Sequence, residues 1–308
     1  MKNTIAIKEH KLSTHQQDTI FAVLCILPVF IGLSFVVFAP IIQAIWISFH
    51  KYRISSSAPP VWNNFQNYIQ MFQDGTALAY FTNTLIFIAG VVITQVILAF
   101  MIALLLNSNI PGQKALRAVF LIPWTIPSVV TALLWTWLLQ PQYGVLNYIF
   151  HALGFQEELN KLWVQDPQLA MVSVIIACVW RQTPYMMIML LAGLQSVPQD
   201  LIEAAKIDGA SKVSIFKNVV LPSIRPVLDT SIVVAIINNS QMFAIIYNMT
   251  AGGPMINTTT VSVAAYKLAF INFDFGAGSA IGVLWLVFLS VFVFFYKKYS
   301  DKNLSSYI

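Results

Sequence analysis

Six long apolar stretches constrain this chain more than any other feature of its sequence. A helix needs about 20 apolar residues to cross the hydrocarbon core of a bilayer, and each stretch is long enough. The stretches are continuously apolar, which favours helices over the alternating strands of a barrel. They cover residues 20–46, 82–106, 118–139, 169–194, 226–247 and 277–296. The sequence therefore predicts an all-α membrane protein with six transmembrane helices.

The composition agrees with a chain embedded in lipid. Only 9% of the residues are charged and 58% are hydrophobic, whereas a soluble domain averages about 25% charged residues. The net charge of +5 could indicate a nucleic-acid partner. The basic residues, however, lie at the ends of the apolar stretches, where they are better interpreted as topology signals, so no nucleic-acid binding is predicted.

The distribution of Lys and Arg predicts the orientation. Twelve of the 17 basic residues lie in the N-terminal segment, after the second stretch, after the fourth stretch or in the C-terminal segment. Four lie in the segments on the opposite side, and Arg181 lies inside the fourth stretch. Because cytoplasmic segments carry the excess of basic residues, residues 1–19 and 297–308 are both predicted to be cytoplasmic, with one six-span domain at 20–296 between them.

The N-terminal apolar run follows several lysines, as the apolar region of a signal peptide would. From Thr19 to Phe49 it contains no charged residue, and it is too long for a signal peptide. We therefore expect a first span that is retained in the protein.

Metal and disulfide chemistry find little support in the sequence. Cys25 and Cys178 both lie inside apolar stretches and are interpreted as small buried hydrophobic residues. The four histidines are scattered outside the spans, with no partner at metal-ligand spacing. We expect no metal, no disulfide framework and no cofactor in this chain.

The most informative loop lies between the fourth and fifth stretches, at about residues 196–222. Ser196 can cap a helix at the start of this loop. Glu203 lies early in that helix, where negative charge is favourable, and the strong helix formers Ala204 and Ala205 follow it. These residues predict a short cytoplasmic helix with a small-residue patch beside an acid.

The remainder of the loop predicts a second short helix. Gly209 can adopt a positive φ and end the first helix. Ser211 can cap the second helix, and Pro222 is expected to end it before the fifth span. Such a pair of helices at the membrane surface is suited to docking into a groove on a partner protein. The alternative is a plain connecting loop.

The spacing of these residues resembles the coupling motif of permeases in binding-protein-dependent ABC importers. The matching residues are Glu203-Ala204-Ala205, Asp208-Gly209 and Leu221-Pro222. Other segments resemble the sugar-importer branch of these permeases, and within it the large permease subunit type of maltose transporters: Leu121–Pro127, Gly144–Asn147, Thr183–Tyr185 and Gly252–Pro254. The large external domain that some members carry is absent, since the segment 50–81 is short.

The resemblance implies a permease half that works with other subunits. Two cytoplasmic ATPase subunits would bind ATP and Mg, and this chain would not be an enzyme, since it has no phosphate-binding motif G-x-x-x-x-G-K-[ST]. A second six-span permease, an extracytoplasmic sugar-binding protein, a sugar substrate and the cytoplasmic (inner) membrane of a bacterium are implied as well. The ATPase-coupling surface would comprise Glu203, Ala204, Ala205, Asp208, Gly209, Leu221 and Pro222.

Polar residues near the middle of the spans are candidates for the substrate path, because polar groups inside a membrane usually face a cavity or another helix. Arg181, Gln182 and Tyr185 form a polar and aromatic stripe in the fourth span. The alternative is an interhelical hydrogen-bond network or a salt bridge from Arg181, either to Asp229 or to the partner permease.

The fifth and third spans supply further candidates. Asn239 and Gln241 belong to a polar belt in the fifth span, and amides both donate and accept hydrogen bonds, as sugar hydroxyls require. Trp124 and Ser128 lie four residues apart in the third span, which its prolines are expected to distort. By the resemblance, these regions line the path. Helix–helix contacts and an interfacial Trp belt are the alternatives.

Other functions fit the sequence less well. A stand-alone secondary carrier would need intramembrane acids, and the stretches contain only Asp229, near one end. A membrane enzyme would need an acid–base or metal cluster, and a structural protein would need no polar belt. Among imported solutes we expect an oligosaccharide, with glycerol phosphate as the alternative.

Overall fold

The computed structural model describes residues 14–54, 58–108, 110–154 and 161–304, and helices dominate these segments. The helices differ widely in length and are joined by short connections. Most of the long helices form a bundle, and other helices protrude from it. The five longest helices are α1 (Thr14–Leu33), α4 (Thr76–Asn107), α8 (Ala170–Gln195), α11 (Leu221–Ser240) and α14 (Phe275–Leu304).

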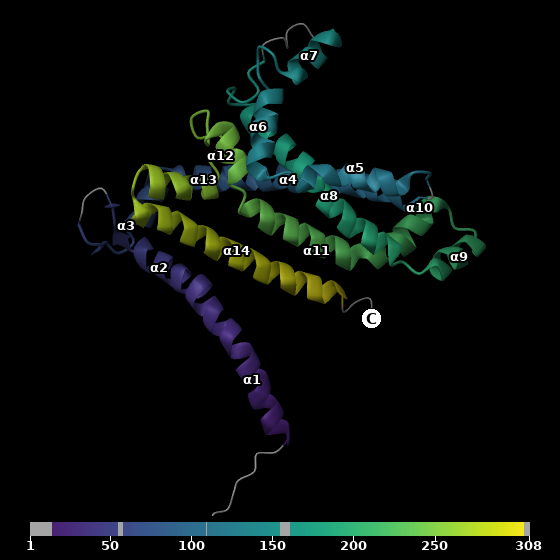
Figure 1. Ribbon diagram of the computed structural model, residues 1–308, viewed down its shortest axis with the longest axis horizontal. Coiled ribbons are helices and arrows are strands. Elements are labelled where there is room, and N and C mark those ends of the chain that lie inside the picture. The colour runs from purple at the N-terminus through teal and green to yellow at the C-terminus, as the bar shows by residue number, and fades with distance from the viewer. Residues whose placement is uncertain (1–13, 55–57, 109, 155–160, 305–308) are drawn as a thin grey trace, which may run out of the picture.

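Shorter elements connect the long helices. The helical ones are α2 (Ala39–Ser48), α3 (Gln66–Gln73), α5 (Gln113–Thr125), α6 (Ser128–Leu138), α7 (Val145–Ala152), α9 (Gln199–Ile207), α10 (Lys212–Ile215), α12 (Ala244–Thr250), α13 (Val261–Tyr266) and π-helical turns at Ser34–Phe38, Phe216–Val220 and Lys267–Ile271. Strands β1 (His50–Lys51) and β2 (Val61–Trp62) form one antiparallel pair. In Figure 1, α4, α5, α8, α11 and α14 extend along the long axis, while α1 diverges from them and α6 and α7 project to the opposite side.

Among the described residues, five helical segments are long and apolar enough to cross a membrane. They are Asp18–Ser48, Thr76–Asn107, Ala170–Gln195, Lys212–Ser240 and Phe275–Lys298. These segments contain most of the first, second, fourth, fifth and sixth predicted stretches. The prediction of a helical membrane protein is confirmed, whereas six crossings and the cytoplasmic placement of both termini stay predictions.

The third predicted stretch, 118–139, is not one continuous helix. Its helices α5 and α6 meet at an angle of 95°. The bend lies at Ile126 and Pro127, which are both extended, with ψ of 130° and 142°. A proline disfavours helical geometry in the residue before it, so the expected proline distortion is confirmed, and it is strong enough to break the stretch in two.

The fifth predicted stretch, 226–247, is also interrupted. Helix α11 ends at Ser240, and α12 begins after a break at residues 241–243. At its other end the helix begins much earlier than predicted, because Lys212–Ser240 is one helical segment of 29 residues. Two stretches that hydropathy alone presents as straight spans are therefore broken, both where polar residues or prolines occur.

Small side chains bring α4 and α8 together at the centre of the bundle. Ala99 and Ala103 of α4 and Ala177 of α8 are completely buried. Small residues let helix backbones approach closely in lipid, where van der Waals packing drives association. Larger side chains such as Phe87 and Met186 fill the remaining space and are almost fully buried. The N-terminal segment Asp18–Ser48 differs, since its most apolar window buries no residue within this chain.

The start of α14 is fixed to the chain that follows α2. Asn67 donates from Nδ2 to the carbonyl oxygen of His50 at 3.0 Å, and Arg53 pairs with Asp274 at 2.7 Å. Gly276 lies directly against this junction. A Cβ at that position would overlap the carbonyl oxygen of His50 and lie 3.0 Å from Nδ2 of Asn67. The junction therefore requires glycine for close approach of two backbones.

Replacing Gly276 with alanine is expected to lower the stability of the purified permease. The added Cβ meets backbone that cannot rotate away, and overpacking of this kind costs about 1–3 kcal/mol. Gly282 provides the matched control on the same helix, since a Cβ there would meet nothing within 4 Å. Thermal unfolding in detergent should give a lower midpoint for Gly276→Ala than for Gly282→Ala, and equal midpoints would contradict this account.

Candidate functional site

The predicted coupling loop contains the helix α9, as its residues indicated. Asp200 lies in the first turn and Lys206 in the last, which are the ends that favour an acid and a base respectively. The N-cap residue is Pro198. Ser196 was expected to cap this helix, and that detail is wrong. Its hydroxyl donates instead to the carbonyl oxygen of Gly193 at 2.8 Å, at the end of α8.

Gly209 ends α9 in the way its conformational freedom predicts. Its φ is +76°, a value that glycine adopts without the steric cost paid by other residues. The amide of Gly209 donates to the carbonyl of Lys206 at 3.1 Å, and the amide of Ala210 donates to the carbonyl of Ala205 at 3.0 Å. This pair of bonds is a Schellman motif, and it turns the chain sharply toward α10.

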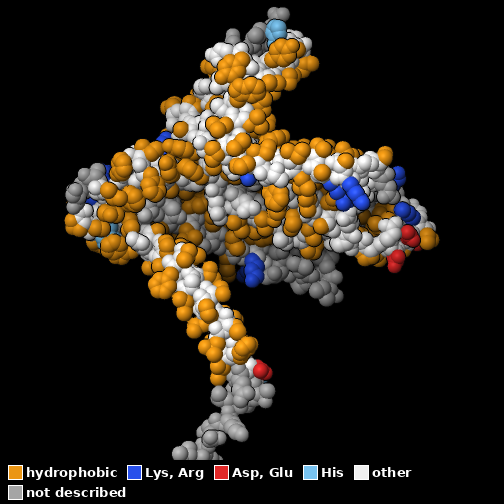
Figure 2. Space-filling view, in the orientation of Figure 1, with side chains coloured by type: hydrophobic (Ala, Val, Ile, Leu, Met, Phe, Trp, Pro, Cys, Tyr) orange, Lys and Arg blue, Asp and Glu red, His pale blue; other side chains and the backbone are white. Residues whose placement is uncertain are grey.

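The surface of α9 is open for a partner. Glu203 and Ala204 are exposed, and Ala205 is partly buried. Leu201 is 51% exposed and Ile207 is 86% exposed, so α9 also offers apolar surface to a partner. Figure 2 shows acidic and basic side chains gathered at the end of the molecule that carries α9 and α10, whereas hydrophobic side chains dominate the rest of the visible surface.

The second part of the loop leads directly into the fifth span. Ser211 caps α10 as predicted, with its Oγ accepting from the amide of Ser214 at 3.2 Å. The prediction that Pro222 ends this helix is wrong. Pro222 has no N–H and cannot donate a helical hydrogen bond. The preceding turn, Phe216–Val220, is π-helical, and this wider turn lets the helix continue past the proline. Leu221 and Pro222 therefore lie within a continuous helix rather than at its end.

Three of the predicted path residues meet at the bend in the third span. The rings of Trp124 and Tyr185 have centroids 5.7 Å apart and planes tilted by 31°. Arg181 donates from Nε to the carbonyl oxygen of Ile126 at 3.0 Å. A cation is favourable at a helix C-terminus, where carbonyl groups lack helical partners. The broken span thus presents aromatic faces and a guanidinium in one place.

Two other path residues bond to each other. Gln182 donates from Nε2 to Oδ1 of Asn239 at 2.9 Å, and both side chains are buried. Gln95, which sequence reasoning missed, donates from Nε2 to the carbonyl oxygen of Gln182 at 3.1 Å. Its position as a polar residue inside an apolar stretch was the available signal. These three residues, called here the amide chain, connect α4, α8 and α11 across the core.

The last two path residues lie apart from these contacts. Ser128 begins α6 just after the bend and is partly buried. Gln241 is exposed at the end of α11. Among the described residues no ion pair joins Arg181 to Asp229. The carboxylate of Asp229 lies 3.8 Å from Nε of Arg225 on its own helix. Local pairing on α11 accounts for that acid.

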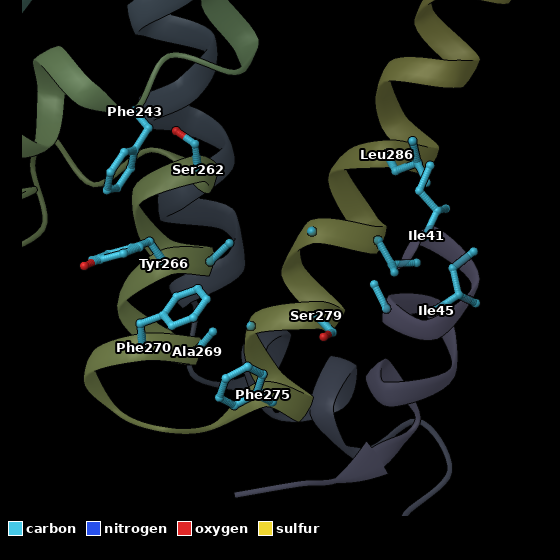
Figure 3. Close-up of a pocket in the computed structure, with 15 residues that line it drawn as sticks. Ile41, Ile45, Phe243, Ser262, Tyr266, Ala269, Phe270, Phe275, Ser279 and Leu286 are labelled. Carbon is cyan, nitrogen blue, oxygen red and sulfur yellow. The ribbon is translucent and has the colours of Figure 1, made fainter. Parts of the chain in front are cut away.

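An apolar groove of about 540 Å³ lies near the break in the fifth span. Its walls come from α2, from α13 with the following π-helical turn, and from α14, as Figure 3 shows. Phe243, Tyr266 and Phe270 contribute aromatic surface. The hydroxyl of Ser262 is already used, since it donates to the carbonyl of Met242 at 2.8 Å. The groove offers sugar hydroxyls few partners, so we do not assign it to the path.

The turn at Gly252–Pro254 is held to the bundle by threonine and asparagine side chains. Thr258 lies 2.6 Å from Thr250, hydroxyl to hydroxyl, and Asn83 donates to the carbonyl of Ile256 at 2.7 Å. Met255 projects from the turn and is 84% exposed. Within the described segments, no group of three or more His, Cys, Asp or Glu side chains could hold a metal ion.

Comparison with known proteins connects this arrangement to a family. Residues 95–306 match the family of binding-protein-dependent transport system inner membrane components. The trehalose/maltose transport system permease protein MalF of Thermococcus litoralis is 35% identical, covering 89% of this chain and 92% of that protein. The sulfoquinovosyl glycerol transport system permease protein SmoG of Agrobacterium fabrum is 32% identical, covering 87% and 86%.

A further relative and a solved structure agree. The sn-glycerol-3-phosphate transport system permease protein UgpA of Yersinia pestis is 35% identical, covering 72% of this chain and 74% of that protein. A bacterial alginate ABC transporter, solved with its alginate pentasaccharide-bound periplasmic protein, contains a chain of the same fold (TM-score 0.80, 21% identity, 95% and 98% covered). The predicted resemblance to sugar importer permeases is confirmed, and the chain belongs to the family of binding-protein-dependent transport system inner membrane components.

Proposed function

We propose that the chain is the transmembrane permease subunit of an ATP-driven, binding-protein-dependent importer for a sugar, with an oligosaccharide as the expected solute. The observation that carries this proposal is the exposed helix α9, which ends in the Schellman motif at Gly209 just before the helical segment of the fifth span. The helix presents Glu203 beside Ala204 and Ala205, so a cleft on an ATPase subunit could approach its backbone closely.

Continuity of the chain would couple this loop to the path. The helical segment Lys212–Ser240 begins next to α9 and ends at the break before α12. A helix transmits displacement along its axis, so closure of the ATPase subunits on α9 would move the far end of α11. That end carries Asn239, which bonds to Gln182 on α8. Alternating access would follow from the movement of these segments against the rest of the bundle.

The sugar path would pass the bend in the third span. Trp124 is 46% exposed and its ring lies beside that of Tyr185, and aromatic faces provide flat surfaces for the apolar face of a sugar ring. Ser128 and Gln241 would supply hydroxyl and amide groups on neighbouring segments. Gln182 and Asn239 saturate part of each other's hydrogen-bonding capacity, so they would shape the path and offer only their remaining polar groups to a solute.

Other subunits would complete the importer. We infer a second six-span permease, two cytoplasmic ATPase subunits that bind ATP and Mg, and an extracytoplasmic sugar-binding protein, all at the bacterial inner membrane. The solved alginate transporter includes a periplasmic protein that carries the sugar, which supports the last of these. The chain would then be a transport subunit without enzymatic activity of its own.

Glycerol phosphate is the alternative solute. Two relatives are named as permeases for sn-glycerol-3-phosphate and for sulfoquinovosyl glycerol, and both solutes contain glycerol and an anionic group. The guanidinium of Arg181 favours this alternative, because it is the only basic side chain within the six apolar stretches.

Affinity purification from the native membrane tests the proposed function. Mass spectrometry should identify a second six-span permease and an ATPase with a phosphate-binding loop in the purified complex. When that complex is reconstituted in vesicles with its binding protein, sugar uptake should require ATP. A chain that purifies alone and moves solute without ATP would show that the coupling argument is wrong and that a secondary carrier is the better description.

A further inference from the structure

Arg181 carries a charge in a place where a charge is expensive. It lies near the middle of α8, and no other basic residue occurs within the six apolar stretches. A charged side chain at the centre of a bilayer costs several kcal/mol unless it meets water, a counter-charge or backbone carbonyls, so such residues usually mark a functional path. Neighbouring groups must therefore offset the free-energy cost of placing this guanidinium in the membrane.

The described residues of this chain compensate Arg181 only in part. Nε donates to the carbonyl oxygen of Ile126 at 3.0 Å, and the terminal nitrogens have no hydrogen-bond partner among the described residues. Asp229 is the only acid within the stretches, and it lies beside Arg225. A guanidinium keeps its charge at any physiological pH. Nε of the guanidinium is thus held by a hydrogen bond, while the N–H donors of its two terminal nitrogens remain available.

The surroundings of these free donors belong to the proposed path. Trp124 precedes Ile126 by two residues, and Tyr185 lies one helical turn beyond Arg181, with the two rings 5.7 Å apart. Aromatic walls supply few acceptors and lower the local dielectric, which strengthens the attraction of a cation for an anion. A neutral sugar could accept hydrogen bonds from the fork, but it would leave the charge uncompensated.

We propose that the imported sugar carries an anionic group, a sulfonate, phosphate or carboxylate, and that Arg181 binds this group while the Trp124 and Tyr185 rings contact the sugar. The inference rests on the proposed importer function and narrows its solute class. The planar fork of Arg matches the oxygens of all three groups. Anchoring of Nε by Ile126 fixes the orientation of the fork before the solute arrives.

Uptake of matched solutes tests the solute class. The complete importer, with its partner subunits and binding protein, is reconstituted in vesicles, and uptake is compared within two matched sets of solutes. The first set pairs neutral glucosyl glycerol with anionic sulfoquinovosyl glycerol. The second set compares neutral glucose with anionic glucose 6-phosphate and glucuronate. ATP-dependent uptake should favour an anionic member, and the preferred member identifies which group is recognised. ATP-dependent uptake of the neutral members with equal or greater efficiency would overturn this inference and leave the importer intact. Absence of ATP-dependent uptake for all members would also overturn this inference, and the importer proposal would then be tested separately with neutral oligosaccharides.

Substitution of Arg181 separates the role of this residue from the selectivity of the binding protein. Arg181→Gln keeps an N–H donor for the carbonyl of Ile126 but removes the charge. It should lower the kcat/KM for the anionic solute about 10- to 100-fold, as expected for loss of a charged hydrogen-bond partner. Arg181→Lys keeps the charge without the planar guanidinium, so its kcat/KM for the anionic solute should lie between the values of the wild type and Arg181→Gln. Lys298→Gln, at the exposed end of α14, removes a charge far from the path and should have no effect.

The KM and the solute preference distinguish recognition from scaffolding. If Arg181 serves the solute, Arg181→Gln should raise the KM for the anionic solute and reduce the preference for anionic over neutral solutes. If the residue only supports the bend at Ile126, the unfolding midpoint and the kcat for every solute should fall together, and the preference should not change. That parallel loss would overturn the proposal.

Discussion

Replacing Glu203 with lysine is expected to leave the permease in the membrane at its normal level and to lower uptake about tenfold or more, as reversal of a charge at a docked interface would do. The side chain is exposed. Among the described residues, the one hydrogen bond of its carboxylate is accepted from Gln199 at 3.3 Å, on the same helix. Little folding energy depends on it, so the loss should appear in coupling. Uptake and ATP hydrolysis are measured together in vesicles that contain the complete importer.

Asp200 offers a matched control for this substitution. It is an exposed acid on the same helix, one turn earlier, and it lies outside the predicted coupling motif. Asp200→Lys changes the net charge by the same amount, so it reports the general effect of added positive charge. Normal uptake by Glu203→Lys at normal expression, or an equal loss in both variants, would contradict a specific role for Glu203 in docking.

Replacing Asn239 with alanine should give the second large effect, because it breaks the amide chain. The substitution leaves Nε2 of Gln182 without its acceptor in a buried site. An orphaned buried donor costs about 1–3 kcal/mol, so both the unfolding midpoint and uptake should decrease. Asn238→Ala is the matched control, since Asn238 is the same residue type one position earlier and is exposed. It should leave the midpoint nearly unchanged.

A double-mutant cycle decides how Asn239 acts. If the bond to Gln182 is its main contribution, the stability effects of Asn239→Ala and Gln182→Ala should be strongly non-additive, with a coupling energy of about 1 kcal/mol or more. ATPase association should persist in both variants. Additive effects on stability, with a raised KM for the solute, would instead show that Asn239 contacts the sugar directly, as the sequence predicted.

Local rules were sufficient to predict the coupling helix from the sequence. Gly209 is suited to a positive φ, Ser211 is suited to an N-cap, and neither requirement depends on distant residues. The errors at Ser196 and Pro222 are local too. Ser196 bonds to the end of α8 instead of the start of α9, and the π-helical turn Phe216–Val220 lets the helix continue through Pro222.

Residues far apart in sequence determined the rest of the candidate site. Hydropathy identified the stretches 118–139 and 226–247, and the prolines predicted a distortion of the first, but neither signal could place Trp124 against Tyr185. The same limit applies to Gln95, whose partner lies 87 residues away. Each polar group in a membrane must find some partner, and the sequence establishes that need. Which partner it finds depends on the helix faces that meet, so the amide chain and the anchoring of Arg181 follow from the packing of the bundle.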